Sequence, residues 1–456
     1  MRDLGPRTTA ARETPRGSRR PAVAERVATI VSADEAALAR VCGLTLLERN
    51  LRALARAGQR EVTVVSASPR VLDAAARRHW SRSSLQVRTL LRKAVADAPF
   101  VTVAELRVVA QQRPLLYVPA ALVCDTRLFE RLLAARESTA LVDSAPPAPL
   151  QAMMAGVART SHGLLCGPCR LEASFLASQP DGAAVGEVLT KSIESAEVRV
   201  LDVAAQVEYV ASLRRTLRPV WFPAPGRGHE GAAEAALLDT AQKGALDVPA
   251  LVHGPIESAI VARVCWTPIT PNQLTVFAAA VAWTATALFA SGRLGLGLVV
   301  ALAVGVLDGL DGKLARLKLE TSRVGELEHF SDFAFELSWW AALAFHFRAT
   351  GMRWAPLVLL ALYLAEALDG LVKLAAIRRL GVLIDDAAPS MRLVRLVGGR
   401  RNVYVWIMVV GFVTGHPAAA FVLLPLWEGA TAALHLAWAL ANLGRFRIAT
   451  PAPERS

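Results

Sequence analysis

The segment 307–332 contains six carboxylates, although long apolar runs lie on both sides of it, and four of them stand in closely spaced pairs. Asp308 and Asp311 are three residues apart, and Glu328 and Asp332 are four residues apart. On a helix each pair shares one face, and the short loop between the pairs makes the two helices antiparallel neighbours. Four oxygen ligands at one depth predict a site for a hard divalent cation, either Mg²⁺, Mn²⁺ or Ca²⁺.

Basic residues and glycines accompany the carboxylates: Lys313, Arg316 and Lys318, and Gly309, Gly312 and Gly325. The cations can meet phosphate, and glycines let a bulky ligand approach the backbone. Together with a divalent metal they indicate a diphosphate ligand and attack at phosphorus. The alternative is an internal ion-pair network, in which Arg316 and Arg323 neutralise the acids. That network accounts for one or two of the four carboxylates.

The elements that must hold these side chains are membrane spans. The chain is 54% hydrophobic, and its long apolar runs begin after residue 250. A span takes about 20 residues, and six segments are candidates: 271–291, 293–310, 327–347, 355–376, 402–415 and 417–441. We therefore predict an all-α bundle of six transmembrane helices over 254–446, followed by a tail at 447–456.

Loop charges give this bundle an orientation. The loops 313–323 and 373–401 carry many Lys and Arg, whereas the loops around 292, 348–353 and 416 carry few. The positive-inside rule then places the N-terminal part, the carboxylates and the C-terminus on the cytoplasmic side of the cytoplasmic membrane. The net charge of +12 suits anionic lipids and phosphorylated substrates. We expect no nucleic-acid partner, because the basic residues are scattered.

Other polar and aromatic residues also lie in the spans. Asp369 and Lys373 are four apart in the fourth span, which predicts an ion pair on one helix face. Trp339 and Trp340 are expected to face lipid or the membrane interface.

The part before residue 250 predicts a separate soluble domain at 24–220. The runs 26–33, 61–67 and 114–124 are typical of buried strands, and the run 44–59 has helical spacing. A strand, a helix and a strand in this order predict a parallel, Rossmann-like α/β sheet.

Two segments flank this domain. Residues 1–23 contain no apolar core and are expected to form a disordered basic arm, and residues 221–253 are expected to form a linker with a short helix.

At the carboxylates the sequence resembles a known family. The run DGLDGKLAR at 308–316, followed after eight residues by Gly325, resembles the signature D-x2-D-G-x2-A-R-x8-G-x3-D-x3-D of CDP-alcohol phosphotransferases. The family spacing then falls on His329 and Phe333. A deletion of one residue brings Glu328 and Asp332 into register, as in the run GELEHFSD. The resemblance covers about residues 254–446.

The resemblance implies a reaction in which a phosphoalcohol group moves from a CDP-linked donor to an acceptor hydroxyl and CMP is released. It implies that Mg²⁺ or Mn²⁺ is held by four residues, Asp308, Asp311, Glu328 and Asp332. Asp332 would also be the general base on the acceptor.

The resemblance also implies binding residues and an oligomeric state. The nucleotide would lie near Gly312, Ala315, Arg316 and Gly325. A basic pocket for a phosphate on the acceptor would lie at Arg400 and Arg401, although a loop that binds lipid headgroups explains these arginines equally well. A homodimer is expected from the family alone.

The N-terminal domain resembles nucleotidyltransferases that make sugar or alcohol nucleotides, through the run LTLLERNLRALARAG at 44–58. Their Gly-rich loop and Pro-Lys pair are replaced here by SADEAALARVCG. We therefore expect the fold without its chemistry. The whole chain resembles fusions of a cytidylyltransferase with a CDP-alcohol phosphotransferase that act in di-inositol-phosphate synthesis.

Three functions remain open from the sequence. The first is transfer of a phosphatidyl-type group from a lipid CDP-donor, in phospholipid or related biosynthesis. The second uses soluble substrates, such as CDP-inositol with inositol phosphate. The third is a non-catalytic membrane anchor or scaffold.

Overall fold

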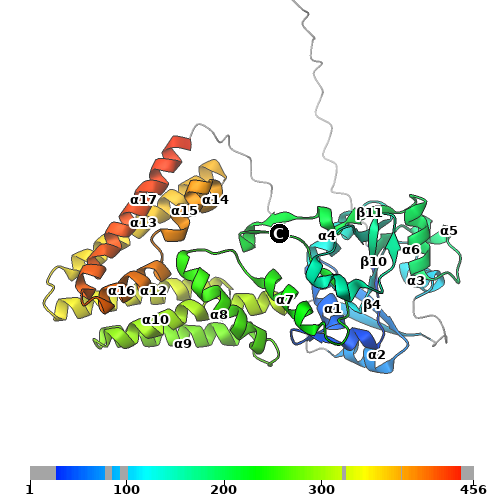
Figure 1. Cartoon of the computed structure of the whole chain (residues 1–456), viewed down its shortest axis with the longest axis horizontal. Helices are drawn as coiled ribbons and strands as arrows, with labels where there is room; N and C mark the ends of the chain where they lie inside the picture. The colour runs from blue at the N-terminus through cyan, green and yellow to red at the C-terminus, as the bar shows by residue number, and fades with distance from the viewer. Residues whose placement is uncertain (1–26, 78–84, 93–100, 321–324, 382, 443–456) are drawn as a thin grey trace, which may run out of the picture.

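The computed structural model describes residues 27–77, 85–92, 101–320, 325–381 and 383–442, with the backbone alone at 325–332 and 380. An α/β domain forms one side of the molecule, long helices form the other, and α7 (Glu230–Ala241) lies between them (Figure 1). The predicted fold class, an α/β domain followed by an all-α region, is confirmed.

The core of the α/β domain is an eight-stranded sheet in the order β11-β8-β10-β6-β1-β4-β5, with β9 paired to β10. Its strands are β1 Ala28–Ser32, β4 Glu61–Ser66, β5 Gln86–Leu91, β6 Leu115–Pro119, β8 Thr139–Asp143, β9 Arg159–Thr160, β10 Gly163–Leu171 and β11 Arg199–Asp202. β1 is parallel to β4 and β6, as predicted. β10 runs antiparallel to β6 and β8, so the sheet as a whole is mixed.

Short strands form three further pairs. They are β2 Arg40–Val41 with β3 Leu44–Thr45, β12 Glu208–Val210 with β13 Arg215–Leu217, and β7 Leu122–Cys124 with β14 Trp221–Pro223. The run 114–124, predicted as one strand, is therefore divided between β6 and β7. The segment 221–253, expected to be a linker, contains β14, α7 and the start of α8.

Helices cover the sheet. They are α1 Leu46–Arg56, α2 Pro69–Ala76, α3 Val103–Ala110, α4 Thr126–Ala134, α5 Ala173–Ser178 and α6 Val185–Glu194, with 3₁₀ turns η1 Glu35–Leu38, η3 Ala148–Met154, η4 Val203–Ala205 and η5 Ala211–Leu213. α1 falls within the predicted helix 44–59. The Thr45 hydroxyl accepts a hydrogen bond from the Glu48 amide and so satisfies one free donor at the start of α1.

The C-terminal region is all helical. Its helices are α8 Val248–Val264, α9 Pro271–Ala290, α10 Leu294–Leu307, α11 Leu310–Leu317, α12 Gly325–Ala349, α13 Ala355–Leu380, α14 Ile384–Ala387, α15 Pro389–Val397, α16 Arg401–Val413 and α17 Pro417–Asn442. α9 begins sharply because Thr270 and Gln273 form a capping box and Pro271 occupies the first turn.

Several of these helices could cross a membrane. Within the described residues four segments are long and apolar enough: Pro271–Ala290, Leu294–Leu317, Ala355–Arg379 and Pro417–Asn442. The pair α15 and α16, bent by 47°, makes five if it counts as one span. The predicted span 327–347 falls on α12, whose first turns have no described side chains.

The helices pack around an aromatic centre, which corrects one prediction. Trp339 and Trp340 are 0% and 1% exposed, so neither faces lipid. The indole Nε1 of Trp339 donates to the Ala282 carbonyl at 2.9 Å, and its ring packs edge-on against Phe289. A span that is apolar all round does not show which side faces its neighbours, and the aromatic-belt rule therefore failed here.

Candidate functional site

Asp308 and Asp311 lie where α10 ends and α11 begins. α10 ends at Leu307 and α11 begins at Leu310, so Asp308 is at the junction and Asp311 is in the first turn of α11. Asp311 is buried, at 6% exposure. Its carboxylate accepts from the Thr275 hydroxyl of α9 at 2.5 Å and from the Gly312 amide. These donors fix the orientation of the carboxylate.

The Asp308 carboxylate faces a cation. Arg401 Nη2 lies 2.7 Å from Asp308 Oδ2, and the Arg401 guanidinium lies 5.0 Å from the centre of the Phe335 ring. The other predicted acceptor residue, Arg400, pairs with Asp385 at 2.5 Å. The structure thus brings one of the two arginines to the carboxylates and places the other with a different acid.

The lysines in α11 and directly after it are held inside the protein. Lys313 Nζ lies 3.1 Å from Glu257 of α8 and donates to the Ser258 hydroxyl at 3.0 Å. Lys318 Nζ donates to the Thr267 and Ile269 carbonyls, and burial lowers the pKa of this amine. The prediction that Lys313 and Lys318 meet phosphate is therefore wrong in this structure, because both amines already bind acceptors within the protein, as buried charged groups must.

Arg316 and Gly312 do lie together. A Cβ on Gly312 would lie 3.2 Å from Arg316 Nη1, while Arg316 Nε donates to the Ala241 carbonyl of α7 at 2.8 Å. Gly309 lies against the Glu257 side chain and not, as predicted, against space for a bulky ligand. A Cβ there would lie 2.5 Å from the Glu257 carboxylate, so this glycine makes room for a protein side chain.

The second acid pair lies on α12, as the predicted helix requires. Glu328 and Asp332 belong to Gly325–Ala349, but their side chains lie outside the described part, and the surroundings of the nucleotide-site residue Gly325 are not described either. The meeting of the two acid pairs therefore stays a prediction. Among the side chains that are described, no group of three or more His, Cys, Asp or Glu is placed to hold a metal ion.

A second polar cluster joins α13, α14 and α17 inside the bundle. The predicted pair is confirmed, with Lys373 Nζ 2.8 Å from Asp369 Oδ2. His435 Nδ1 lies 2.6 Å from Asp369 Oδ1, and Lys373 lies 3.7 Å from Asp385. Polar groups inside a membrane bundle pair with one another in this way. Because Asp385 also holds Arg400, this cluster adjoins the start of α16.

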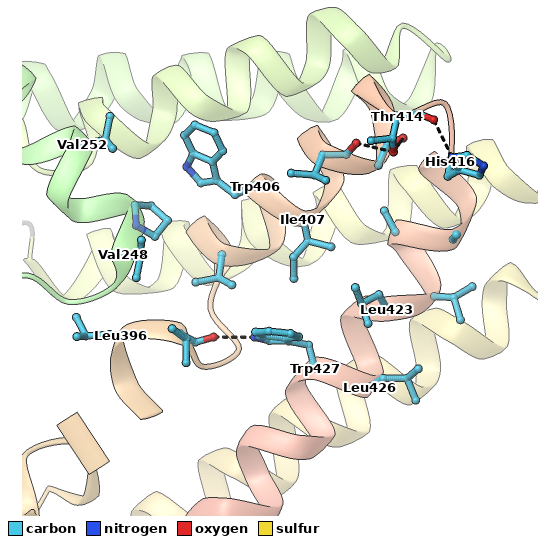
Figure 2. Close-up of a pocket in the computed structure, with 18 residues that line it drawn as sticks. Val248, Val252, Leu396, Trp406, Ile407, Thr414, His416, Leu423, Leu426 and Trp427 are labelled. Atoms are coloured by element: carbon cyan, nitrogen blue, oxygen red, sulfur yellow. Dashed lines mark hydrogen bonds between the residues drawn. The ribbon is translucent and has the colours of Figure 1, made fainter. Parts of the chain in front are cut away.

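An apolar groove of about 820 Å³ runs between α8, α15, α16 and α17 (Figure 2). Its lining includes Val248, Trp406, Ile407, Leu423 and Trp427. The groove extends along α16 from Val403 to Thr414. Val403, where the lining of the groove on α16 begins, follows Arg401 by two residues in the sequence, and Arg401 pairs with Asp308.

Three residues at the site were not expected from the sequence: Thr275, Glu257 and Asp385. Each meets a predicted residue through a contact between different helices, and no local spacing signals such a contact. Thr275 alone lies in a motif with a visible signal, the capped start of α9.

Residues 268–440 match the model of the CDP-alcohol phosphatidyltransferase family. The C-terminal region is a domain of this family. The match includes Asp308, Asp311, Gly312 and Arg316, and it begins just before the cap of α9.

Two curated relatives are also similar to this chain in sequence. The chain is 30% identical over 169 residues to the bifunctional IPC transferase and DIPP synthase of Aquifex aeolicus, covering 34% of this chain and 36% of that one. It is 28% identical over 190 residues to the protein of the same name from Rubrobacter xylanophilus, covering 39% and 37%. The matched region thus spans about a third of the length of these relatives.

Solved structures show weaker likenesses. A UDP-glucose pyrophosphorylase from Acinetobacter baumanii covers 47% of this chain and 94% of its own at 9% identity and a TM-score of 0.35. The phosphatidylinositol phosphate synthase of Mycobacterium tuberculosis covers 44% and 98% at 19% identity and a TM-score of 0.32. Scores this low add nothing to what the sheet and helices of the chain itself show.

Proposed function

We propose that this chain is an integral membrane CDP-alcohol phosphotransferase, which moves a phosphoalcohol group from a CDP-linked donor to an acceptor hydroxyl and releases CMP. The observation that carries the proposal is the site at the α10–α11 junction, inside the region that matches the family. There Asp308 lies at the junction and Asp311, Gly312 and Arg316 lie on α11, within a segment that is long and apolar enough to cross a membrane.

The residues present fit a divalent cation such as Mg²⁺ or Mn²⁺. The donors are carboxylate oxygens, which hard cations prefer. Asp308 is paired with Arg401, and a bound metal would replace this ion pair. Asp308, Asp311, Glu328 and Asp332 would hold the metal. Bound there, it would neutralise the diphosphate and the developing charge on the leaving CMP.

The chain's own side chains then have separate tasks. Thr275 and the Gly312 amide hold the Asp311 carboxylate in one orientation. Gly312, Ala315, Arg316 and Gly325 form the proposed nucleotide surface. Asp332 takes the proton from the acceptor hydroxyl, whose oxygen forms the new bond to phosphorus while the bond to the CMP oxygen breaks.

The apolar groove favours a lipid donor. It lies among the apolar helices (Figure 2), and its lining includes Val403, which follows the Asp308 partner Arg401 by two residues in the sequence. An acyl chain of a membrane lipid is an apolar group that could occupy such a groove. A donor such as CDP-diacylglycerol would place its diphosphate at the carboxylates and a chain along α16.

A soluble donor is the second candidate, and the names of the curated relatives favour it. Both are bifunctional IPC transferase and DIPP synthase proteins, so CDP-inositol with inositol phosphate is the soluble pair to test. In either case we propose that Arg400 and Arg401 bind a phosphate when the acceptor carries one. Their present partners, Asp385 and Asp308, would then be exchanged for that phosphate.

The proposal also covers the membrane topology and the oligomeric state of the protein. We propose that six helices span the cytoplasmic membrane, that the site and the α/β domain face the cytoplasm, and that the protein forms a homodimer among membrane lipids. The loop charges support this orientation. We also propose that the α/β domain, which lacks the Gly-rich loop and the Pro-Lys pair, transfers no nucleotide.

The test is CMP release by the full-length protein in lipid nanodiscs. CDP-diacylglycerol and CDP-inositol would each be combined with inositol, inositol phosphate or glycerol phosphate, with Mg²⁺, Mn²⁺ or EDTA. We expect metal-dependent CMP release with the lipid donor, its loss in Asp332→Asn, and normal release in Asp73→Asn, which changes an exposed acid on α2.

Other results would change the assignment. Release from CDP-inositol alone would replace the lipid donor by the soluble one. No release from either donor would leave the non-catalytic scaffold, and full turnover by Asp332→Asn would remove the proposed base.

A further inference from the structure

Three arginines on one face of α1 reach the end of α11. Arg49 Nη1 donates to the Leu317 carbonyl at 2.9 Å, Arg52 Nη1 to the Lys318 carbonyl at 2.7 Å, and Arg56 Nη2 to the Glu320 carbonyl at 2.8 Å. The spacing of three and four residues along α1 makes this face a single stripe. The last carbonyls of a helix have no partner within it, and cations stabilise that end. The α/β domain thus caps α11, the helix that carries Asp311.

The contact of Arg49 is deep. The residue is 3% exposed, and its second nitrogen, Nη2, donates to the Val41 carbonyl of its own domain at 3.2 Å. Burial lowers the pKa of Arg49 to about 10, so the guanidinium is still charged at neutral pH. A buried charge is costly unless it is well hydrogen-bonded. The position of the Arg49 guanidinium therefore depends on the Leu317 carbonyl of the helical region and the Val41 carbonyl of the α/β domain.

Apolar packing surrounds this cap. Leu310, Leu314 and Leu317 of α11 are each at most 2% exposed and belong to the same core cluster as Leu47 and Leu51 of α1. The helix that carries the site is therefore partly built into the core of the α/β domain.

A close backbone approach fixes the neighbouring seam. Gly43, in the turn between β2 and β3, has a φ of +81°, and a Cβ there would lie 2.0 Å from the Cys265 carbonyl oxygen at the end of α8. Only glycine fits this position. Two separate contacts, at α11 and at α8, thus fix the α/β domain against the helices next to the site.

We infer that the α/β domain serves as a platform that positions α11, with Arg49 as a positioning residue for the Asp308–Asp311 site. The claim that this positioning matters for catalysis rests on the proposed function, whereas the claim that the α/β domain holds α11 in place does not. α11 is eight residues long, too short to be stable alone. Its start holds Asp311 against Thr275 and its end is held by Arg49. A loosened end would move the carboxylates, and small displacements of catalytic groups are costly.

The test uses Arg49→Met, which keeps the bulk of the side chain and removes its donors. The matched control is Arg107→Met, because Arg107 donates to the Leu176 and Ala177 carbonyls within the α/β domain only. Both variants are made in the full chain in nanodiscs. Hydrogen–deuterium exchange at 310–317 and Mn²⁺ affinity by electron paramagnetic resonance are measured for each, with CMP release as the third readout.

We expect Arg49→Met to speed α11 exchange and weaken Mn²⁺ binding, each on the order of tenfold or more, since a hydrogen bond from a charged donor is lost. Arg107→Met should leave both within about twofold of the original chain. Arg49→Lys, which keeps a cation near Leu317, should recover part of the loss. An arginine with only a general stabilising role would lower the unfolding temperature and leave Mn²⁺ affinity unchanged.

Unchanged exchange in α11 and unchanged Mn²⁺ affinity in a folded Arg49→Met protein would overturn the inference. If that variant does not fold, Arg52→Met takes its place, with the same expected and contrary results. If the original chain releases no CMP while Arg49→Met still loosens α11, the transferase proposal fails and the platform stands.

Discussion

The substitution Thr275→Val tests how the site is held. The Thr275 hydroxyl donates to Asp311 Oδ2 at 2.5 Å across 36 residues of sequence, and valine has the same shape without the donor. A hydrogen bond to a charged group contributes about 1.5–3 kcal/mol. Because about 1.4 kcal/mol corresponds to a factor of ten, its full loss predicts a fall of roughly 10- to 150-fold in kcat/KM for the CDP-donor.

The assay is initial-rate CMP release at several Mn²⁺ concentrations. The matched control is Thr284→Val on the same helix. The Thr284 hydroxyl, like that of Thr275, lies within hydrogen-bond distance of the carbonyl four residues earlier, but among the described side chains it meets no carboxylate of the site. If the two variants have the same kcat/KM, Thr275 does not hold Asp311 in the working enzyme, and the derived geometry of the α10–α11 junction is wrong.

Two further predictions concern the bundle. Gly399→Ala should destabilise the protein by about 1–3 kcal/mol or more, because a Cβ at Gly399 would lie 1.5 Å from Glu428 Oε2, whereas nothing lies within 4 Å of a Cβ at Gly429. Thermal unfolding of Gly399→Ala and Gly429→Ala checks this, and equal midpoints would contradict it. Trp339→Ala should cost about 3–5 kcal/mol, while Trp283→Ala, at a residue 48% exposed, should cost far less in detergent. Equal losses would show that Trp339 is not part of the core.

Local spacing predicted the parts of the site that depend on local structure. The helix that carries Glu328 and Asp332 and the ion pair Asp369–Lys373 both follow from helix periodicity. The strands β1 and β4 and helix α1 followed from apolar patterns of the same short range.

Contacts between distant residues could not be predicted in this way. Arg401 and Asp308 are 93 residues apart, and Arg49 and Leu317 are 268 apart. No spacing rule connects such residues. The phosphate prediction for Lys313 and Lys318 is wrong for the same reason. Their partners come from α8 and from the segment just after it, and local spacing does not reveal these contacts.

The most direct test of the central claim is Mn²⁺ binding by the full chain, measured by electron paramagnetic resonance. The claim is that carboxylates from the α10–α11 junction and from α12 share divalent cations. We predict that Asp308→Asn and Asp332→Asn each weaken binding by about tenfold or more, and that Asp73→Asn binds like the original chain. If Mn²⁺ binds the Asp308 and Asp332 variants as tightly as the original chain, the two acid pairs do not form one metal site.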